Sequence, residues 1–170
     1  MTPLLPVEEA LSRVLASVTP VSETLSLALV DALGKVLAED VISSLDVPGE
    51  DNSAMDGYAL RTADSAQALP VSQRIPAGYV GTPLQPGTAA RIFTGAAIPV
   101  GADAVVMQEN CRESDGIVSV EGEVRPGQNI RPRGQDIVRG ARVLEAGRRL
   151  RAQDLGLLAS VGRDRARVYR

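Results

Sequence analysis

The sequence predicts an α+β fold in which an all-β segment is inserted between mixed flanks, and three observations lead to this prediction. Residues 7–18 repeat apolar side chains at the spacing of an amphipathic helix. From residue 41 to about 140 that spacing disappears, and short β-branched runs alternate with Gly, Pro, Asp and Asn. Beyond residue 140, a strand-like run precedes a second helical stretch at 150–162. Helix-containing flanks around a β-rich centre indicate α+β architecture.

The first predicted helix starts near Pro6, which suits the first position of a helix. Glu8 and Glu9 follow in the first turn, where the helix dipole favours negative charge. The apolar stripe of this helix has no evident partner nearby in the sequence. Residues 25–29 then alternate like a short strand, and residues 29–37 return to helical spacing, although Gly34 weakens a helix by about 1 kcal/mol relative to Ala.

Four strands are expected within the β-rich segment, at residues 55–61, 89–94, 104–108 and 117–120. A hairpin turn that joins the last two of these strands is expected at residues 113–116, because Asp115-Gly116 tolerates the positive φ angles of a tight turn.

The C-terminal flank is expected to hold a strand at 142–144 and a helix closed by Gly162. Ala166 and Val168 then alternate with arginines like the opening of another strand, which needs a partner. Together with the uncovered first helix, this strand suggests a piece of a larger protein, or one completed by a second copy.

The amino-acid composition excludes several classes of functional site. The 170 residues include one cysteine and no histidine, which excludes a disulfide framework, a cysteine zinc site and a serine–histidine triad. No apolar run reaches the roughly 18 residues of a membrane helix, so we expect no membrane partner. Any chemistry must use carboxylates, hydroxyls, backbone amides and arginines.

Charge is uneven along the chain. Residues 125–170 carry twelve arginines and four acids, whereas residues 1–124 carry six cations and seventeen acids. Such asymmetry suits an anionic ligand or an acidic partner, or docking of the two segments on each other. Because only four aromatic residues are present, nucleic acid is not an expected partner.

Three clusters hold candidate functional residues. In the first, residues 51–59, Asp56 can hold a divalent cation or simply cap a turn. In the second, Thr94 and Gly95 follow a strand and can face an anion, or form an ordinary strand exit. In the third, residues 127–136, arginines and Asp136 can bind an oxyanion or form a surface ion-pair loop.

Taken together, these blocks resemble the molybdopterin molybdenumtransferase family, which includes the bacterial MoeA proteins and the E domain of gephyrin. The resemblance covers essentially the whole chain and rests on four stretches: Asp46 to Ala59, Arg91 to Ala96, Gly101 to Glu109 and Gly127 to Ile137.

The resemblance implies a domain plan. Residues 1–20 would form a helix that packs on an α/β domain absent from this chain. Residues 21–45 and 141–170 would form a small mixed α/β domain, and residues 46–140 an inserted β-rich, barrel-like domain. This chain would then be the N-terminal half of the family's sequence, inactive alone.

The resemblance also implies the reaction, which inserts molybdate into adenylylated molybdopterin, releases AMP and requires a divalent cation. Asp56, Thr94 and Asp136 match active-site positions of the family, and Mg²⁺ is expected at Asp56 and Asp136. Contacts to the pterin nucleotide are expected from a further set of residues: Asn52, Ser53, Gly95, Arg131 and Arg133.

The resemblance further implies a cytoplasmic homodimer and a molybdopterin adenylyltransferase as the upstream enzyme. Gln135 stands where a glutamate is frequent, and Arg151 replaces the usual small hydroxyl residue at a helix cap. Two other functions stay open at this point, a non-catalytic dimerisation or scaffold module of the same family and an unrelated phosphohydrolase with an acidic site.

Overall fold

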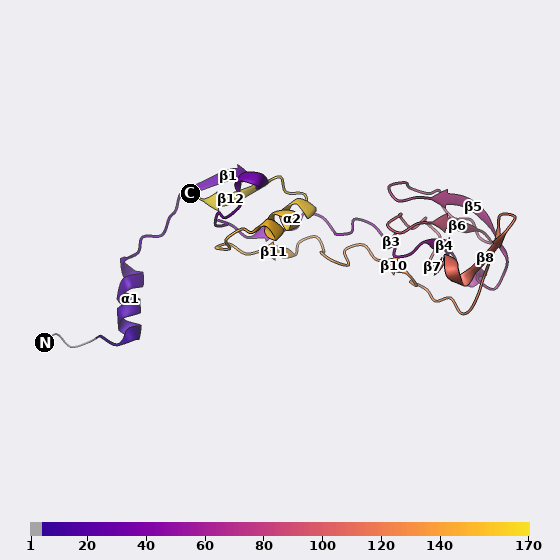
Figure 1. Cartoon of the computed structure of the whole chain (residues 1–170), viewed down its shortest axis with the longest axis horizontal. Helices are drawn as coiled ribbons and strands as arrows, with labels where there is room; N and C mark the ends of the chain where they lie inside the picture. Colours follow the sequence, from indigo (N-terminus) through magenta and orange to yellow (C-terminus); the bar gives the residue numbers. More distant parts are fainter. Residues whose placement is uncertain (1–4) are drawn as a thin grey trace. The chain divides into compact units, whose positions relative to one another are not determined.

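The computed structural model describes residues 5–170, and the chain divides into two compact units (Figure 1). Unit 1 comprises Met1–Val41 and Leu144–Arg170, and unit 2 comprises Ile42–Val143. Helices and strands occur together, so the chain is a mixed α/β protein, in agreement with the predicted fold class at that level. None of the described helices is long and apolar enough to cross a membrane.

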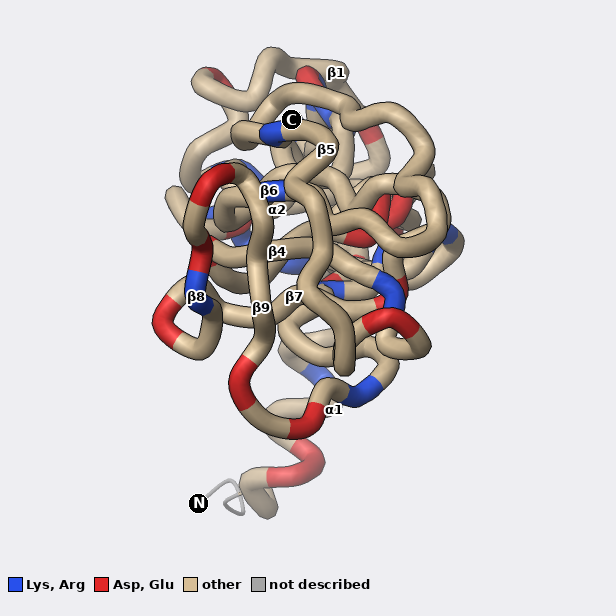
Figure 2. The backbone as a smooth tube through the Cα atoms, turned by 90° about the vertical axis from the view of Figure 1, so that its right-hand side faces the viewer, with Lys and Arg blue, Asp and Glu red and all other residues tan. Residues whose placement is uncertain are grey.

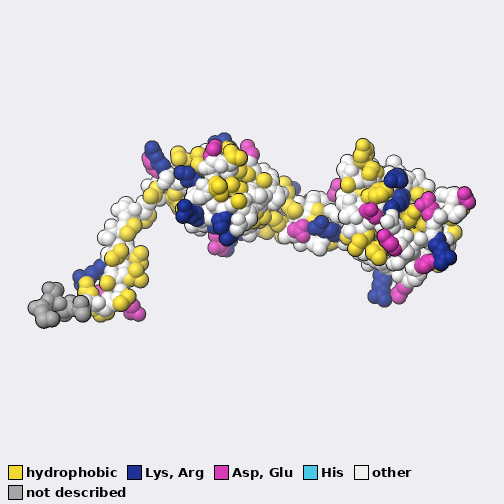
Figure 3. All heavy atoms as spheres, viewed as in Figure 1, with side chains coloured by type: hydrophobic (Ala, Val, Ile, Leu, Met, Phe, Trp, Pro, Cys, Tyr) yellow, Lys and Arg dark blue, Asp and Glu magenta, His cyan; other side chains and the backbone are white. Residues whose placement is uncertain are grey.

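The predicted first helix is confirmed as α1, Val7–Ser17, in unit 1. Pro6 precedes it as the N-cap, and Glu9 pairs with Arg13 at 2.7 Å one turn later. No residue of α1 is buried, and Figure 3 shows hydrophobic side chains open on its surface. Leu11 and Leu15 remain 56% and 63% exposed. The stripe seen in the sequence is therefore uncovered in the described part of this chain.

The predicted terminal strand is β12, Arg165–Tyr169, and it has a partner within the chain. It pairs antiparallel with β1, Thr24–Ala28, so that Thr24 lies opposite Tyr169. Ala166 and Val168 are buried, as their alternation predicts. The expectation of an unpaired last strand is therefore wrong.

The helix predicted at 29–37 is also wrong. Only a single 3₁₀ turn forms, η1, Leu29–Asp31. Gly34 adopts a φ of 76°, and its N–H donates to the Leu150 carbonyl at 2.8 Å. Leu37 N–H donates to the Arg148 carbonyl at 2.9 Å. These hydrogen bonds to residues 148–150 take the place of helical ones, and tertiary pairing overrides the local spacing.

The second predicted helix is confirmed as α2, Ala152–Ser160, and Gly162 follows it with a φ of 78°. Arg151 precedes the helix and offers no hydroxyl to cap it. Instead, the Asp154 carboxylate turns back and accepts the Arg151 N–H at 2.9 Å. Asp154 itself is buried and pairs with Arg148 at 2.8 Å.

Unit 2 is built on a six-stranded sheet with the order β7-β4-β6-β5-β9-β8. All neighbours are antiparallel except β5 and β6. The 3₁₀ turn η3, Gln108–Asn110, connects the two edge strands β7 and β8. The strand bounds are β4 Gly57–Leu60, β5 Leu69–Ile75, β6 Ala89–Ile92, β7 Ala104–Met107, β8 Cys111–Ser114 and β9 Ile117–Val120.

Apolar residues alternate between two cores of this sheet. Ala59, Ala90 and Val105 belong to one cluster, whereas Tyr58 and Val106 belong to another. The four strands predicted in this segment are confirmed as β4, β6, β7 and β9. The sequence reading missed β5, in which buried Leu69 and Ile75 enclose polar positions.

The predicted hairpin turn lies between β8 and β9, where charged residues gather (Figure 2). Asp115 and Gly116 have φ values of 52° and 75°. These angles are the ones for which an Asp-Gly pair is suited, so the turn is confirmed. The strand before the turn is β8, which was not predicted, rather than the predicted strand at 104–108, because that strand, β7, pairs with β4.

Short pairs complete the fold. β3, Asn52–Ser53, pairs with β10, Ile130–Arg131, and β2, Val41–Ile42, pairs with β11, Arg142–Leu144. Another 3₁₀ turn, η2, covers Thr62–Asp64. Ser43 N–H donates to the Ala141 carbonyl at 2.8 Å and Val47 N–H to that of Ile137 at 2.7 Å, so the two ends of unit 2 run side by side.

Candidate functional site

The structure brings Asp56 and Thr94 together although 38 positions separate them. Asp56 stands just before β4, and Thr94 lies two residues beyond β6. Since these strands are neighbours, with Gly57 opposite Ile92, the two side chains meet at one end of the sheet. Asp56 Oδ1 accepts both the Thr94 N–H and the Thr94 hydroxyl, each at 2.8 Å.

These contacts keep Asp56 ionised. The backbone hydrogen bond from Thr94, followed by the hydroxyl hydrogen bond, holds the pKa of Asp56 below its ordinary value. The Arg91 charge acts in the same direction, and partial desolvation opposes it. Among the described residues, no hydrogen bond or ion pair reaches Oδ2 of this exposed carboxylate. Asp56 therefore presents a charged oxygen to solvent.

Strand β3 connects this pair with the third sequence cluster. The Gly95 N–H donates to the Ser53 carbonyl at 2.8 Å, beside Thr94. On the other edge of β3, Asn52 lies opposite Arg131 of β10. The predicted nucleotide-binding residues Asn52, Ser53, Gly95 and Arg131 therefore lie on adjoining segments within unit 2.

Asp136 forms an ion pair of its own. Arg131 Nη2 contacts Asp136 Oδ2 at 2.9 Å, and both side chains are about half exposed, at 45% and 50%. The Arg131 guanidinium occupies Asp136 Oδ2 directly, whereas no ion pair of a described residue reaches either oxygen of Asp56. Arg131 is positioned by β10 and Asp136, which suits it to face an anion.

Arg133 lies in the same loop, but its side chain contacts Asp46 rather than Asp136. Its Nε contacts Asp46 Oδ2 at 2.6 Å, and its backbone N–H donates to Asp51 Oδ1 at 2.7 Å. The Arg139 N–H, and then the Arg133 side chain, hold the pKa of Asp46 below its ordinary value. Arg133 therefore fixes this loop to residues 46–51, and its guanidinium remains 58% exposed.

The residues suit a divalent cation only in part. Within residues 5–170, no three Asp, Glu, His or Cys side chains come together as a metal site. Mg²⁺ typically takes one or two carboxylates and completes its shell with water and phosphate oxygens. Asp56, ionised and open at Oδ2, fits that role, and the other ligands must come from substrate or solvent.

The sequence reading did not single out Arg91, although it quoted this residue within a motif. Arg91 lies on β6 opposite Tyr58 and Arg74. Its guanidinium lies 4.4 Å from the ring centre of Phe93 and 5.3 Å from that of Tyr58. The available signal was an arginine in an otherwise apolar strand, where an unpartnered charge is costly.

Two neighbouring groups are held uncharged. Burial, and then the hydrogen bond that Tyr58 donates to Glu113, raise the pKa of Tyr58 to about 12. Burial raises the pKa of the half-buried Cys111 thiol to about 11. Neither group is suited to act as a nucleophile or base near neutral pH.

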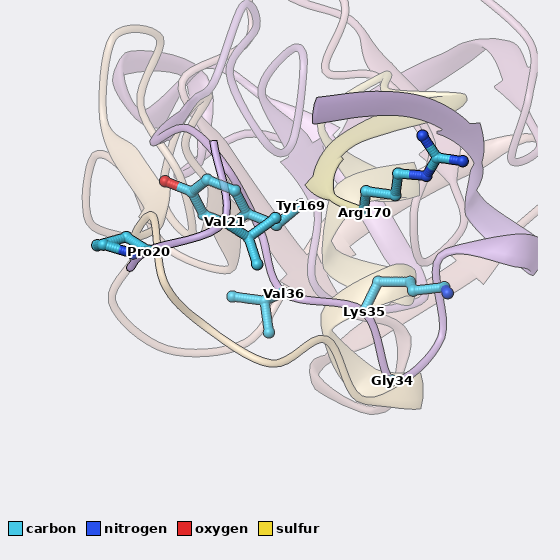
Figure 4. Close-up of a pocket in the computed structure, with 7 residues that line it drawn as sticks. All are labelled: Pro20, Val21, Gly34, Lys35, Val36, Tyr169 and Arg170. Atoms are coloured by element: carbon cyan, nitrogen blue, oxygen red, sulfur yellow. The ribbon is translucent and has the colours of Figure 1, made fainter. Parts of the chain in front are cut away.

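Unit 1 has a hollow of about 550 Å³ (Figure 4). Val21, Val36 and Tyr169 give it an apolar lining, and Lys35 and Arg170 add two cations. None of the site residues predicted from the sequence lines it, so the candidate site lies within unit 2.

Comparison with known proteins gives one consistent family. The family described as the MoeA N-terminal region (domain I and II) matches residues 5–162. The chain is 41% identical to a molybdopterin molybdenumtransferase of Haemophilus influenzae, over 98% of this chain and 42% of the relative. It is 40% identical to molybdopterin molybdenumtransferase 2 of Mycobacterium tuberculosis, over 88% of this chain and 39% of the relative.

A solved structure has the same fold. The crystal structure of the molybdopterin biosynthesis moeA protein from Pyrococcus horikoshii superposes with a TM-score of 0.91 at 37% identity. It covers 98% of this chain, which corresponds to 46% of that protein. The chain therefore spans less than half the length of these relatives.

Proposed function

The chain belongs to the family of the MoeA N-terminal region, and from this premise we propose that it supplies one part of a molybdopterin molybdenumtransferase site. The complete site inserts molybdate into adenylylated molybdopterin and releases AMP. The chain spans 42% of the H. influenzae relative, and we propose that the activity requires residues beyond those present here.

The observation that carries this proposal is the joining of three sequence clusters in unit 2. Asp56 and Thr94 meet through two hydrogen bonds, and β3 lies between Gly95 and Arg131. One ionised carboxylate with an open oxygen is therefore linked, through Thr94, Gly95 and β3, to the segment that holds Arg131. A phosphate-linked nucleotide and an oxyanion both need this combination of cation-binding and anion-binding groups.

Asp56 would hold Mg²⁺, and Asp136 would add its second oxygen beside Arg131. The cation, when bound, would neutralise negative charge on the phosphate linkage. The Thr94 hydroxyl donates to Asp56, so it meets the substrate as a hydrogen-bond acceptor. Asn52, Ser53 and Gly95 would line the nucleotide, while Arg131 and Arg133 would bind its phosphates.

The test is reconstitution of turnover. Adenylylated molybdopterin, molybdate and Mg²⁺ are mixed with this chain, alone or with a polypeptide that supplies the remaining length of a relative. We expect little or no AMP from the chain alone and restored release in the mixture. Asp56→Asn keeps the shape of the side chain but removes its charge, and it should lower the restored rate about a hundredfold.

A matched control is Glu123→Gln, which removes a surface carboxylate that is 77% exposed. It should leave the restored rate unchanged. Normal turnover in Asp56→Asn would contradict the role of Asp56. Full turnover by the unmixed chain would contradict the proposal that the site is incomplete.

Membership of this family also suggests a domain plan, a location and an oligomeric state for the protein. Residues 46–140 would be the inserted barrel-like domain, and residues 21–45 with 141–170 the mixed α/β domain. The N-terminal helix of residues 1–20 would pack on an α/β domain supplied by the remaining sequence. The protein would work in the cytoplasm as a homodimer that receives its substrate from a molybdopterin adenylyltransferase.

The second candidate is a non-catalytic dimerisation or scaffold module, and uncovered α1 is the observation that favours it. Val7 is 83% exposed and Val14 is 60% exposed on a helix with no buried residue. Sedimentation velocity of the 170-residue chain tests this candidate. A dimer that Leu11→Gln converts to a monomer, while Glu8→Gln does not, supports it. A monomer at all concentrations contradicts it.

A further inference from the structure

The side chain of Arg91 makes three hydrogen bonds at the end of the sheet where Asp56 and Thr94 meet, in addition to the backbone pairing of its strand. Its Nη1 donates to the Gly57 carbonyl at 2.8 Å and to the Ile92 carbonyl at 3.0 Å. Its Nη2 donates to Gln108 Oε1 at 2.5 Å. One half-buried guanidinium therefore reaches three segments of the chain, namely the start of β4, the end of β6 and η3.

Each of these contacts lies next to the Asp56–Thr94 pair. Gly57 directly follows Asp56, and Ile92 lies two residues before Thr94. Gln108 completes the set, because its backbone N–H donates to the Asp56 carbonyl at 3.0 Å. Displacement of any of the three segments would change the distance between the Asp56 carboxylate and the Thr94 hydroxyl.

We infer that Arg91 is a positioning residue that holds Asp56 and Thr94 in hydrogen-bonding register through Gly57, Ile92 and Gln108. It does not itself meet the substrate. The importance of this register for catalysis rests on the function proposed above, whereas the positioning itself is a property of the chain and can be measured without substrate.

The rings beside Arg91 fix its orientation. Phe93 and Tyr58 lie 4.4 and 5.3 Å from the guanidinium, distances at which a cation is attracted to a ring face. A planar guanidinium can stack on a ring and donate in its own plane at the same time, which an ammonium group cannot do. Arginine therefore suits this position better than lysine.

Arg74 provides a matched control. It pairs with Arg91 across β5 and β6, and its guanidinium lies 4.6 Å from the same Phe93 ring. Among the described residues, none forms a hydrogen bond or ion pair with the Arg74 side chain. Arg74→Gln and Arg91→Gln thus remove the same charge and a contact to the same Phe93 ring. Only Arg91→Gln also removes the three hydrogen bonds and the contact to the Tyr58 ring.

Amide hydrogen exchange, followed by NMR in the 170-residue chain, tests the inference. The Thr94 N–H is the direct probe, because it donates to Asp56. The Val118 N–H, on β9 of the same sheet, reports the stability of the sheet as a whole. In Arg91→Gln we expect Thr94 protection, relative to Val118, to fall about tenfold, since hydrogen bonds around a charged group are lost. In Arg74→Gln the ratio should stay within about twofold of wild type.

An unchanged ratio in Arg91→Gln, or an equal fall in Arg74→Gln, would overturn the inference. Arg91→Lys keeps the charge without the fork and should recover less than half of the lost protection. Complete recovery in Arg91→Lys would show that charge alone suffices and would also overturn it.

If Arg91→Gln does not fold, the variant Gln108→Ala tests the inference in its place. Gln108 is exposed, and its truncation removes the Nη2 contact together with a 3.3 Å hydrogen bond that Gln108 Nε2 donates to Glu109 Oε1. Because Glu109 makes no hydrogen bond with the Asp56–Thr94 pair among the described residues, a fall of about threefold is expected from the Nη2 contact. No change in Thr94 protection would overturn the inference.

Titration of the wild-type chain with Mg²⁺ alone is a separate measurement. Failure to bind Mg²⁺ would count against the proposed cation role of Asp56 and leave the result on Arg91 standing.

Discussion

Unit 1 and unit 2 each hold an aspartate whose surroundings lower its pKa, and the two carboxylates make opposite use of their oxygens. Asp154 in unit 1 is 3% exposed, and both of its oxygens are occupied, Oδ1 by Arg148 and Oδ2 by Arg151. Asp56 in unit 2 is exposed, and Thr94 occupies only its Oδ1. Both have lowered pKa values, so the shift alone does not separate them. The number of occupied oxygens does, because a saturated carboxylate stabilises the fold and an open one can bind a ligand.

The largest effect is expected from the strand that presents Asp56. A Cβ atom at Gly57 would lie 1.9 Å from the Val106 carbonyl oxygen, so Gly57→Ala must separate β4 from β7. We expect a loss of about 3 kcal/mol or more in the free energy of unfolding, measured by urea denaturation. Gly49→Ala meets no atom within 4 Å and should change it little. Equal stability of the two variants would show that β4 is not held as described.

The next effect tests the saturated carboxylate. Asp154→Asn removes the charge that Arg148 and Arg151 share at the start of α2, and it should cost about 2 kcal/mol. Asp164→Asn, at an exposed position in the same unit, is the control and should lie within about 0.5 kcal/mol of wild type. A cost for Asp154→Asn as small as that of the control would remove the distinction between the two carboxylates.

The pH dependence of the free energy of unfolding should show the pH range in which the Asp154 carboxylate stabilises the fold. The hydrogen bond from Arg148 is the main cause that lowers the pKa of Asp154 to about 2. Because the unfolded chain binds this proton near pH 3.9, the contribution is complete above about pH 4 and is lost as the pH falls towards about 2. The stability difference between wild type and Asp154→Asn, from urea denaturation at several pH values, should shrink across that range. A constant difference down to pH 2 would contradict the assignment.

The smallest effect on stability is expected at the open carboxylate. An asparagine at position 56 can still accept from Thr94, so thermal unfolding of Asp56→Asn should stay within about 2 °C of wild type. Differential scanning calorimetry measures this shift. A decrease as large as that of Asp154→Asn would mean that Asp56 serves the fold rather than a ligand.

Local patterns predicted the local parts of this structure well. The apolar stripe of α1, the Asp115-Gly116 turn and the alternation of Ala166 and Val168 each follow from residues close together in the sequence. The helix expected at 29–37 fails because residues 148–150 supply hydrogen bonds that no local spacing reveals.

The candidate site follows the same rule. Asp56 and Thr94 could be selected by residue type and by family resemblance, but their meeting depends on the pairing of β4 with β6. Arg91 was missed as a functional residue because two of its acceptors, Gly57 and Gln108, lie 34 and 17 positions away, and the sequence does not show them to be neighbours. Contacts between strands, rather than residue types, decide what such a side chain does.

The adjacent ends of unit 2 have a consequence for how this protein can be taken apart. Ser43 and Ala141 are joined by a backbone hydrogen bond, as are Val47 and Ile137. The first and last residues of unit 2 therefore lie side by side. A segment with neighbouring ends can be excised, circularised or grafted into a foreign loop without a long linker. The β-rich unit 2 therefore has the closely spaced ends that excision or grafting requires.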